Sequence, residues 1–101
     1  MYILIDIGGT KTRVAVTEHR EAFLEPVVFP TPQDFNEWFI LLKDTAKTLL
    51  QGRKVNGLVA GLPGTFTDEG VIIVTPNLVH WENVSLQQHL SDYFSCSTSK
   101  E

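Results

Sequence analysis

Several features of secreted, membrane-bound and nucleic-acid-binding proteins are missing from this sequence. The only cysteine among its 101 residues is Cys96, so no internal disulfide can form, and a single thiol fits a reducing, cytoplasmic compartment. No apolar run approaches the roughly 20 residues that a membrane-spanning helix needs. The apolar N-terminus has no basic segment and no small-residue cleavage site of a signal peptide. The formal net charge is −4 without a basic cluster, which argues against nucleic acid as a partner.

The sequence also lacks the residue groupings of common metal and nucleophile sites. Cys96, His19 and His89 have no partners at the spacing of zinc ligands. No Ser-His-Asp or Cys-His arrangement can be argued from the residue order. Asp68 and Glu69 fall in a predicted turn and are interpreted as solvated. The sequence therefore offers no catalytic residue.

What the chain does have is the composition of one soluble domain. Hydrophobic residues make up 43% of the sequence and charged residues 20%, which is typical of globular proteins. A chain of 101 residues can bury a modest core. We find no internal repeat and no low-complexity segment.

The first thirty residues predict an antiparallel meander. Apolar and polar residues alternate over residues 2–7 and 12–18, and residues 23–29 are apolar and rich in β-branched side chains. A polar turn at residues 19–21 separates the last two segments. Short turns between successive strands favour antiparallel pairing.

A helix follows, and its predicted ends are marked by capping residues. Thr31 is expected as the N-cap, Pro32 as the first helical residue and Gly52 as the stop. Apolar residues recur in steps of three and four, which predicts one buried stripe. The stripe comprises Phe35, Trp38, Phe39, Leu42, Ala46, Leu49 and Leu50. We interpret Trp38 and Phe39 as core residues rather than as a platform for a cofactor.

The second half predicts a strand that returns beside the first. Residues 55–60 should pair in parallel with an earlier strand, because a strand that follows a helix usually does so. The loop at residues 61–64 then lies at the carboxyl end of that strand, where α/β proteins usually bind ligands. The remaining expectations are a turn at 67–70, a strand at 71–74, an irregular stretch at 75–78, and a helix at 86–94 with a capping box of Ser85 and Gln88.

The chemically richest segment is the predicted hairpin between the first two strands. Asp6 ends the first strand, Gly8 and Gly9 can take left-handed backbone angles, and Thr10, Lys11 and Thr12 add hydroxyls and an ammonium. Successive N–H groups in such a turn form an anion site, and Asp6 could hold Mg²⁺. A plain Gly-Gly hairpin explains the same residues equally well. The glycine spacing matches neither a Walker loop nor a dinucleotide-binding fingerprint.

Three segments in order resemble the N-terminal lobe of the ROK family of repressors, open reading frames and sugar kinases. They are Asp6 to Thr12 (DIGGTKT), Gly61 to Gly64 (GLPG) followed by Gly70 to Ile72 (GVI), and Pro76 to Trp81 (PNLVHW). The resemblance implies an α/β, ribonuclease H-like fold of the actin-like ATPase and sugar kinase type, with a mixed sheet and helices. The resemblance covers nearly the whole chain, and it implies that residues 1–101 form one lobe.

The resemblance also implies ligands and the residues that bind them. The family's kinases transfer the γ-phosphoryl group of ATP to a sugar hydroxyl with Mg²⁺. Asp6 would support the metal, and Gly8, Gly9, Thr10, Lys11 and Thr12 would bind the ATP phosphates. The sugar pocket would be lined by Gly64, Thr65 and Asn77, although a turn-forming role explains Asn77 without the family. Which sugar is bound is not specified.

The match has gaps that limit the expected activity. The family's catalytic aspartate lies in a Glu-Asn-Asp-Ala-Asn type motif, and the chain ends where that motif should begin, at Lys100 and Glu101. The second lobe, which supplies the adenosine pocket, is also absent. We therefore expect no turnover from these residues alone, since phosphoryl transfer needs positioning, charge neutralisation and a base together.

Three other functions stay open alongside that of a kinase lobe. The chain could be a non-catalytic phosphate- or sugar-binding or interaction module, a ROK-type regulator lobe, or a related ATPase with another substrate. A start at the first strand, with no helix-turn-helix domain ahead of it, favours the kinase over the repressor. Surfaces meant to contact the rest of a larger protein would be exposed, so we expect a homo-oligomer or poor solubility.

Overall fold

The strands of the N-terminal meander are where the alternating pattern predicts them. The computed structural model describes residues 1–18, 25–75, 77–95 and 98–100. Strands β1 (Tyr2–Ile7), β2 (Lys11–Thr17) and β3 (Val27–Pro30) pair antiparallel in sequence order. The polar turn expected at residues 19–21 and the start of the third strand lie outside the described residues.

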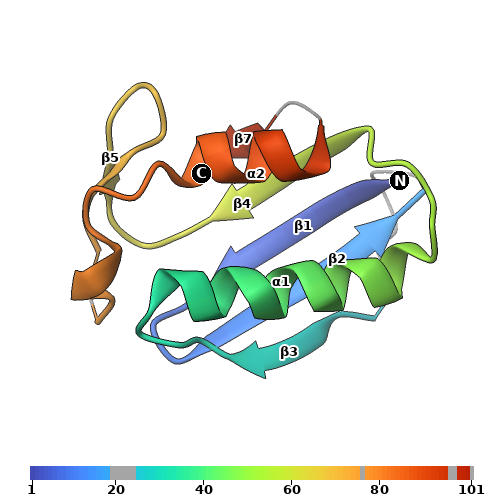
Figure 1. The fold of residues 1–101 in the computed structure, drawn as a ribbon, viewed down its shortest axis with the longest axis horizontal. Coiled ribbons are helices and arrows are strands. Elements are labelled where there is room, and N and C mark those ends of the chain that lie inside the picture. Colours follow the sequence, from blue (N-terminus) through green and yellow to red (C-terminus); the bar gives the residue numbers. More distant parts are fainter. Residues whose placement is uncertain (19–24, 76, 96–97, 101) are drawn as a thin grey trace.

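Two parallel strands extend this meander into a mixed sheet. Strand β4 (Gly57–Gly61) pairs in parallel with β1, as predicted, and β7 (Thr98–Lys100) pairs in parallel with β4. The strand order is β3-β2-β1-β4-β7. Because β1 and β4 run the same way, their carboxyl ends meet at one edge of the sheet, at the left of Figure 1.

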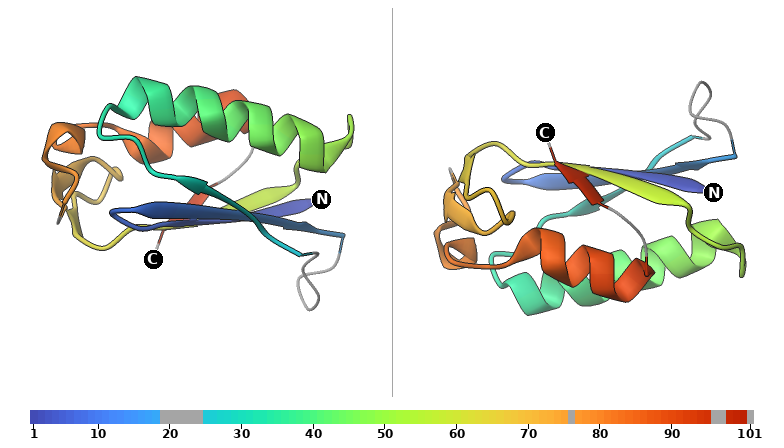
Figure 2. Two further views of the ribbon diagram at one scale, coloured as in Figure 1. Left: turned by 90° about the horizontal axis from the view of Figure 1, so that it is seen from below. Right: turned by 90° about the horizontal axis from the view of Figure 1, so that it is seen from above.

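Both long helices cover the same face of the sheet. The two views of Figure 2 show α1 (Phe35–Leu50) and α2 (Leu86–Phe94) on one side of the strands, with no described helix on the other. The predicted stripe of α1 is buried at Phe35, Trp38, Leu42, Ala46 and Leu50. It packs on every second residue of the central strands, among them Ile3, Ile5, Val14 and Leu58. No helix among the described residues is long and apolar enough to cross a membrane.

Helix α1 begins later than its sequence signals suggested. The N-cap is Asp34, whose carboxylate accepts a hydrogen bond from the Glu37 N–H at 3.0 Å, and not Thr31. Thr31 cannot cap the helix because its hydroxyl is paired with Thr12 and its N–H with the Thr10 carbonyl. Gly52 follows the C-cap with a φ of 81°, as predicted for a stop signal.

A small second sheet connects β4 to α2. Strands β5 (Thr65–Phe66) and β6 (Ile72–Val74) form a hairpin whose turn ends at Gly70, with a φ of 80°. A single 3₁₀ turn, η1 (Val79–Trp81), follows. Helix α2 has the predicted bounds, but the predicted capping box is wrong, because Ser85 makes no side-chain cap. The Gln88 amide instead donates to Asp92 at 2.7 Å, one turn further along the helix.

Candidate functional site

The three sequence segments that suggested ligand binding lie together at one edge of the sheet. Asp6 on β1 pairs directly with Gly61 on β4, so the hairpin after β1 and the loop after β4 leave the sheet side by side. The β5–β6 hairpin then returns the chain to the same edge, where Asn77 follows. Ligand sites in open α/β sheets lie at this carboxyl edge.

The hairpin tip is tight, but for a different reason from the one expected. At the tip, the Gly8 backbone N–H donates a hydrogen bond to the Lys11 carbonyl at 2.8 Å. Neither Gly8 nor Gly9 takes a left-handed backbone angle, which corrects the expectation of positive φ. Glycine is needed for space instead, since a Cβ on Gly8 would lie 2.9 Å from the Lys11 carbonyl oxygen. The tip is therefore closed by contacts that any side chain would disrupt.

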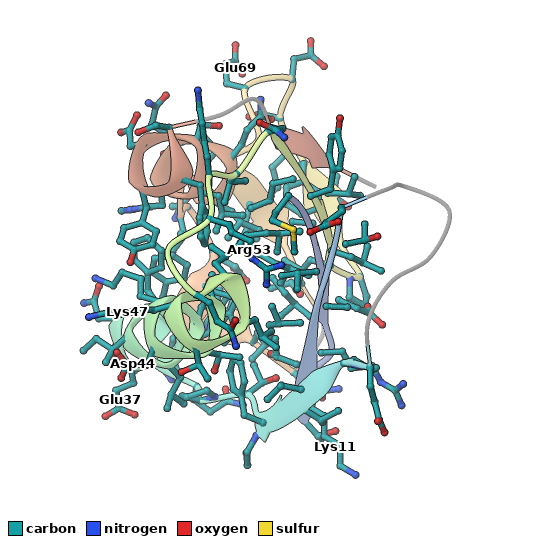
Figure 3. The ribbon with its side chains drawn as sticks, turned by 90° about the vertical axis from the view of Figure 1, so that its right-hand side faces the viewer. Lys11, Glu37, Asp44, Lys47, Arg53 and Glu69 are labelled. Atoms are coloured by element: carbon teal, nitrogen blue, oxygen red, sulfur yellow. The ribbon has the colours of Figure 1, made fainter. Side chains whose placement is uncertain are left out.

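Three polar side chains surround this tip and are open to solvent. Asp6, Thr10 and Lys11 are all exposed, and Figure 3 shows Lys11 projecting away from the protein past β3. The described residues contain no cluster of three His, Cys, Asp or Glu that would hold a metal by protein ligands alone. One carboxylate suits Mg²⁺ bound mainly by phosphate oxygens and water. Asp6, Thr10 and Lys11 therefore have the chemistry that a Mg²⁺–polyphosphate would need.

Thr12 differs from its neighbours because it faces the core. Its side chain has no exposed surface, and its hydroxyl lies 2.8 Å from that of Thr31. The Trp38 indole N–H also donates to the Thr12 hydroxyl, at 3.0 Å. With both contacts made inside the protein, Thr12 anchors the hairpin to α1 and presents no hydroxyl to a ligand.

Asn77 rests directly on the hairpin. A Cβ placed on Gly9 would lie 2.9 Å from the Asn77 Cβ and 3.3 Å from its amide nitrogen, so only glycine leaves room there. Asn77 has a φ of 64°, a left-handed conformation that asparagine tolerates better than most residues. The Gln33 side-chain amide donates to the Asn77 carbonyl at 2.8 Å. The exposed Asn77 side chain is thus held beside the tip by contacts from two other segments.

The Gly64 loop is tied to the segment that precedes Asn77. Gly64 has a φ of 149°, and the exposed Thr65 pairs with Val74 across the small hairpin. The hydroxyl of the buried Thr75 donates to the Pro63 carbonyl at 2.7 Å. Gly64, Thr65 and Asn77, the residues predicted to bind the sugar, are therefore on two segments joined by a hydrogen bond, and Thr65 itself begins strand β5.

Sequence reasoning missed the residues that join these loops. Gln33, Thr31 and Thr75 carry the hydrogen bonds between segments. Gln33 and Thr75 are common loop residues without a motif, and Thr31 was predicted only as a helix cap. The described residues also form an open pocket of about 400 Å³, but it lies at the other end of α1, lined in part by Lys47, Leu50 and Tyr93. It is separate from the Gly-Gly hairpin.

The strand order and helix placement are those of a ribonuclease H-like lobe of the actin-like ATPase class. The chain belongs to the ROK family, whose family model matches residues 2–101. No curated protein sequence matches the chain.

Solved structures agree with this fold assignment. A ROK family glucokinase from Streptomyces griseus, in complex with glucose and AMPPNP, superposes with a TM-score of 0.82 at 21% identity, over 99% of this chain and 32% of that one. A glucokinase from Parabacteroides distasonis gives 0.84 at 21% identity, over 99% and 30%. A ROK transcriptional regulator, a homolog of the E. coli MLC protein, gives 0.75 at 14% identity, over 98% and 27%. The chain thus spans about a third of the solved structures that it resembles.

Proposed function

We propose that this chain is the N-terminal lobe of an ATP-dependent sugar kinase and carries half of its ligand site. Gly8, Gly9, Thr10 and Lys11 bind the phosphate tail of ATP, and Asp6 holds the Mg²⁺ that neutralises it. Gly64, Thr65 and Asn77 bind the hexose. The observation that supports the proposal is the contact of Asn77 with Gly9, because it brings a residue that we assign to the sugar next to one that we assign to the phosphates.

Each group has a chemical role suited to phosphoryl transfer. The Lys11 ammonium offsets phosphate charge, and the Thr10 hydroxyl donates a hydrogen bond. The Asn77 amide offers both a donor and an acceptor, which matches a sugar hydroxyl. Thr12 is assigned to the support of the hairpin and not to ligand binding. No residue is assigned as the general base, so we expect binding without turnover.

Binding to the chain itself tests this proposal. Isothermal titration with glucose and with Mg²⁺–tripolyphosphate, which mimics the ATP tail, should give one saturable site for each. Lys11→Met should weaken the binding of the polyphosphate and leave the binding of glucose unchanged. Asn77→Ala should weaken the binding of glucose by about tenfold, as expected for the loss of one or two hydrogen bonds. Lys54→Met, at the other end of α1, serves as the matched control for Lys11. No saturable binding of either probe would refute the proposal.

A second candidate is a regulator lobe that senses a sugar. It is favoured by one specific observation, the similarity to a ROK transcriptional regulator. The same titration separates the two functions, because a sensor lobe needs the hexose and not the polyphosphate. Glucose binding with no response to Mg²⁺–tripolyphosphate would therefore favour the regulator.

A further inference from the structure

Among the described residues, the loop that carries Asn77 has few backbone hydrogen bonds of its own. The Leu78 N–H reaches the Thr75 carbonyl only at 3.5 Å, and the Trp81 N–H donates to the Leu78 carbonyl at 2.9 Å. The Trp81 indole N–H is buried without a hydrogen-bond partner among the described residues. The base of this loop is therefore held mainly by the packing of Trp81 against Phe35 and Trp38.

At the level of Asn77 the loop has two contacts with other segments. No additional atom fits between Gly9 and the Asn77 side chain. The Gln33 side-chain amide donates to the Asn77 carbonyl at 2.8 Å, across 44 positions of sequence. Gln33 also stands directly before Asp34, the cap of α1, so it joins the loop to the start of that helix.

The hairpin is tied to the same short segment. Two residues before Gln33, the Thr31 N–H donates to the Thr10 carbonyl at 2.9 Å. Residues 31–33 therefore contact the phosphate hairpin at one end and the Asn77 loop at the other. These three residues therefore form a continuous hydrogen-bonded link between the two loops.

We propose that Gln33 is a positioning residue that holds Asn77 against the hairpin and so couples sugar binding to phosphate binding. This inference rests on the proposed function, and it adds an interaction between the two ligands. Since coupling between two sites is reciprocal, glucose should tighten the polyphosphate by the factor by which the polyphosphate tightens glucose. We expect a factor of about five, the lower end of the usual range, because the Gln33 bond is at the surface.

The experiment measures this factor in wild type, Gln33→Met and Gln88→Met. Mg²⁺–tripolyphosphate is titrated with and without saturating glucose, and glucose with and without the polyphosphate. Gln33→Met removes the donor and keeps the side-chain length, and it should bring the factor to about one. Gln88→Met is the matched control, because Gln88 also loses an exposed amide hydrogen bond, the one to Asp92. Equal thermal unfolding of the three proteins excludes a loss of folding.

Each outcome separates this inference from the function on which it rests. A factor that persists in Gln33→Met overturns the coupling role and leaves the proposed function intact. If wild type binds neither probe, the proposed function fails, and the coupling fails with it. The positioning contact is then judged from backbone amide NMR spectra without ligand. There Gln33→Met should shift the amide resonances of Gly9 and Asn77, and Gln88→Met should not; unchanged resonances would overturn the contact itself.

Discussion

At the scale of single residues, Thr12 shows how one hydroxyl can support a whole loop. It is fully buried, accepts a hydrogen bond from the Trp38 indole and shares a second with Thr31. A buried donor that loses its hydrogen-bond partner destabilises the protein by its full desolvation free energy. The Gly-Gly hairpin is therefore anchored by a side chain that faces the core and not the solvent.

Replacing Thr12 by valine should destabilise the fold. The two side chains have the same shape, so Thr12→Val leaves the Trp38 N–H and the Thr31 hydroxyl unpaired without opening a cavity. We expect a loss of about 1–3 kcal/mol in the free energy of unfolding, measured by urea denaturation. Thr48→Val, at an exposed position on α1, should change it by less than about 0.5 kcal/mol. Equal losses in the two variants would contradict the role of the buried hydroxyl.

At the scale of elements, two glycines with nearly the same φ angle are required for different reasons. Gly52 after α1 has a φ of 81° and Gly70 in the β5–β6 turn has a φ of 80°. A Cβ on Gly52 would meet no atom within 4 Å, whereas one on Gly70 would collide with the Gln87 side chain on α2. Gly52 is thus required by conformation alone, and Gly70 also by the packing of α2 on the small hairpin.

Alanine substitutions separate these two requirements. Gly52→Ala should cost about 1–2 kcal/mol, the usual penalty for a left-handed residue with a side chain. Gly70→Ala should cost more, since α2 must also shift. Thermal and urea unfolding of both variants would measure the difference, and an equal cost would mean that the Gln87 contact relaxes freely.

Local patterns predicted both α-helices and most of the strands, but not the short strands β5 and β7. The two helix caps that they assigned wrongly are explained by side-chain pairs that the patterns do not reveal. Alternation located β1 and β2, and the apolar stripe located the buried face of α1. The N-cap was wrongly assigned to Thr31 because the partner of its hydroxyl, Thr12, is 19 positions away. The Ser85 capping box was wrong for a local reason, because the Gln88 amide pairs with Asp92 one turn further along α2.

The same distinction applies to the candidate site. The motifs named Asp6, Lys11 and Asn77, whose chemistry is visible in their residue types. They did not name Gln33, and they did not reveal that Gly9 is there to admit Asn77. Such requirements depend on which loops meet, and that follows from the topology of the sheet.

At the scale of the whole molecule, the described helices cover only one side of the sheet. The face away from α1 and α2 carries Leu4 and Val28, which are 36% and 45% exposed. Val27, which is on the edge strand β3, is also exposed at 40%. Apolar surface of this kind tends to recruit a partner.

We expect the chain to self-associate through this open face. Leu4→Glu should lower the apparent mass in light scattering at high protein concentration. Self-association through the face would bury the new charge at its centre, which is costly. Ile40→Glu, on the exposed side of α1, is the matched control and should leave the mass unchanged. A wild-type chain that stays monomeric at every concentration would contradict the expectation.

The two tryptophans have a consequence for how this protein absorbs and emits light. The rings of Trp38 and Trp81 lie 4.9 Å apart with their planes at 60°, and both are fully buried. At this separation the electronic transitions of the two indoles interact, so the optical activity of each indole depends on the other. One of them lies on the helix behind the hairpin and the other at the base of the loop with Asn77. The near-ultraviolet optical activity of the chain therefore depends on the angle between these two segments.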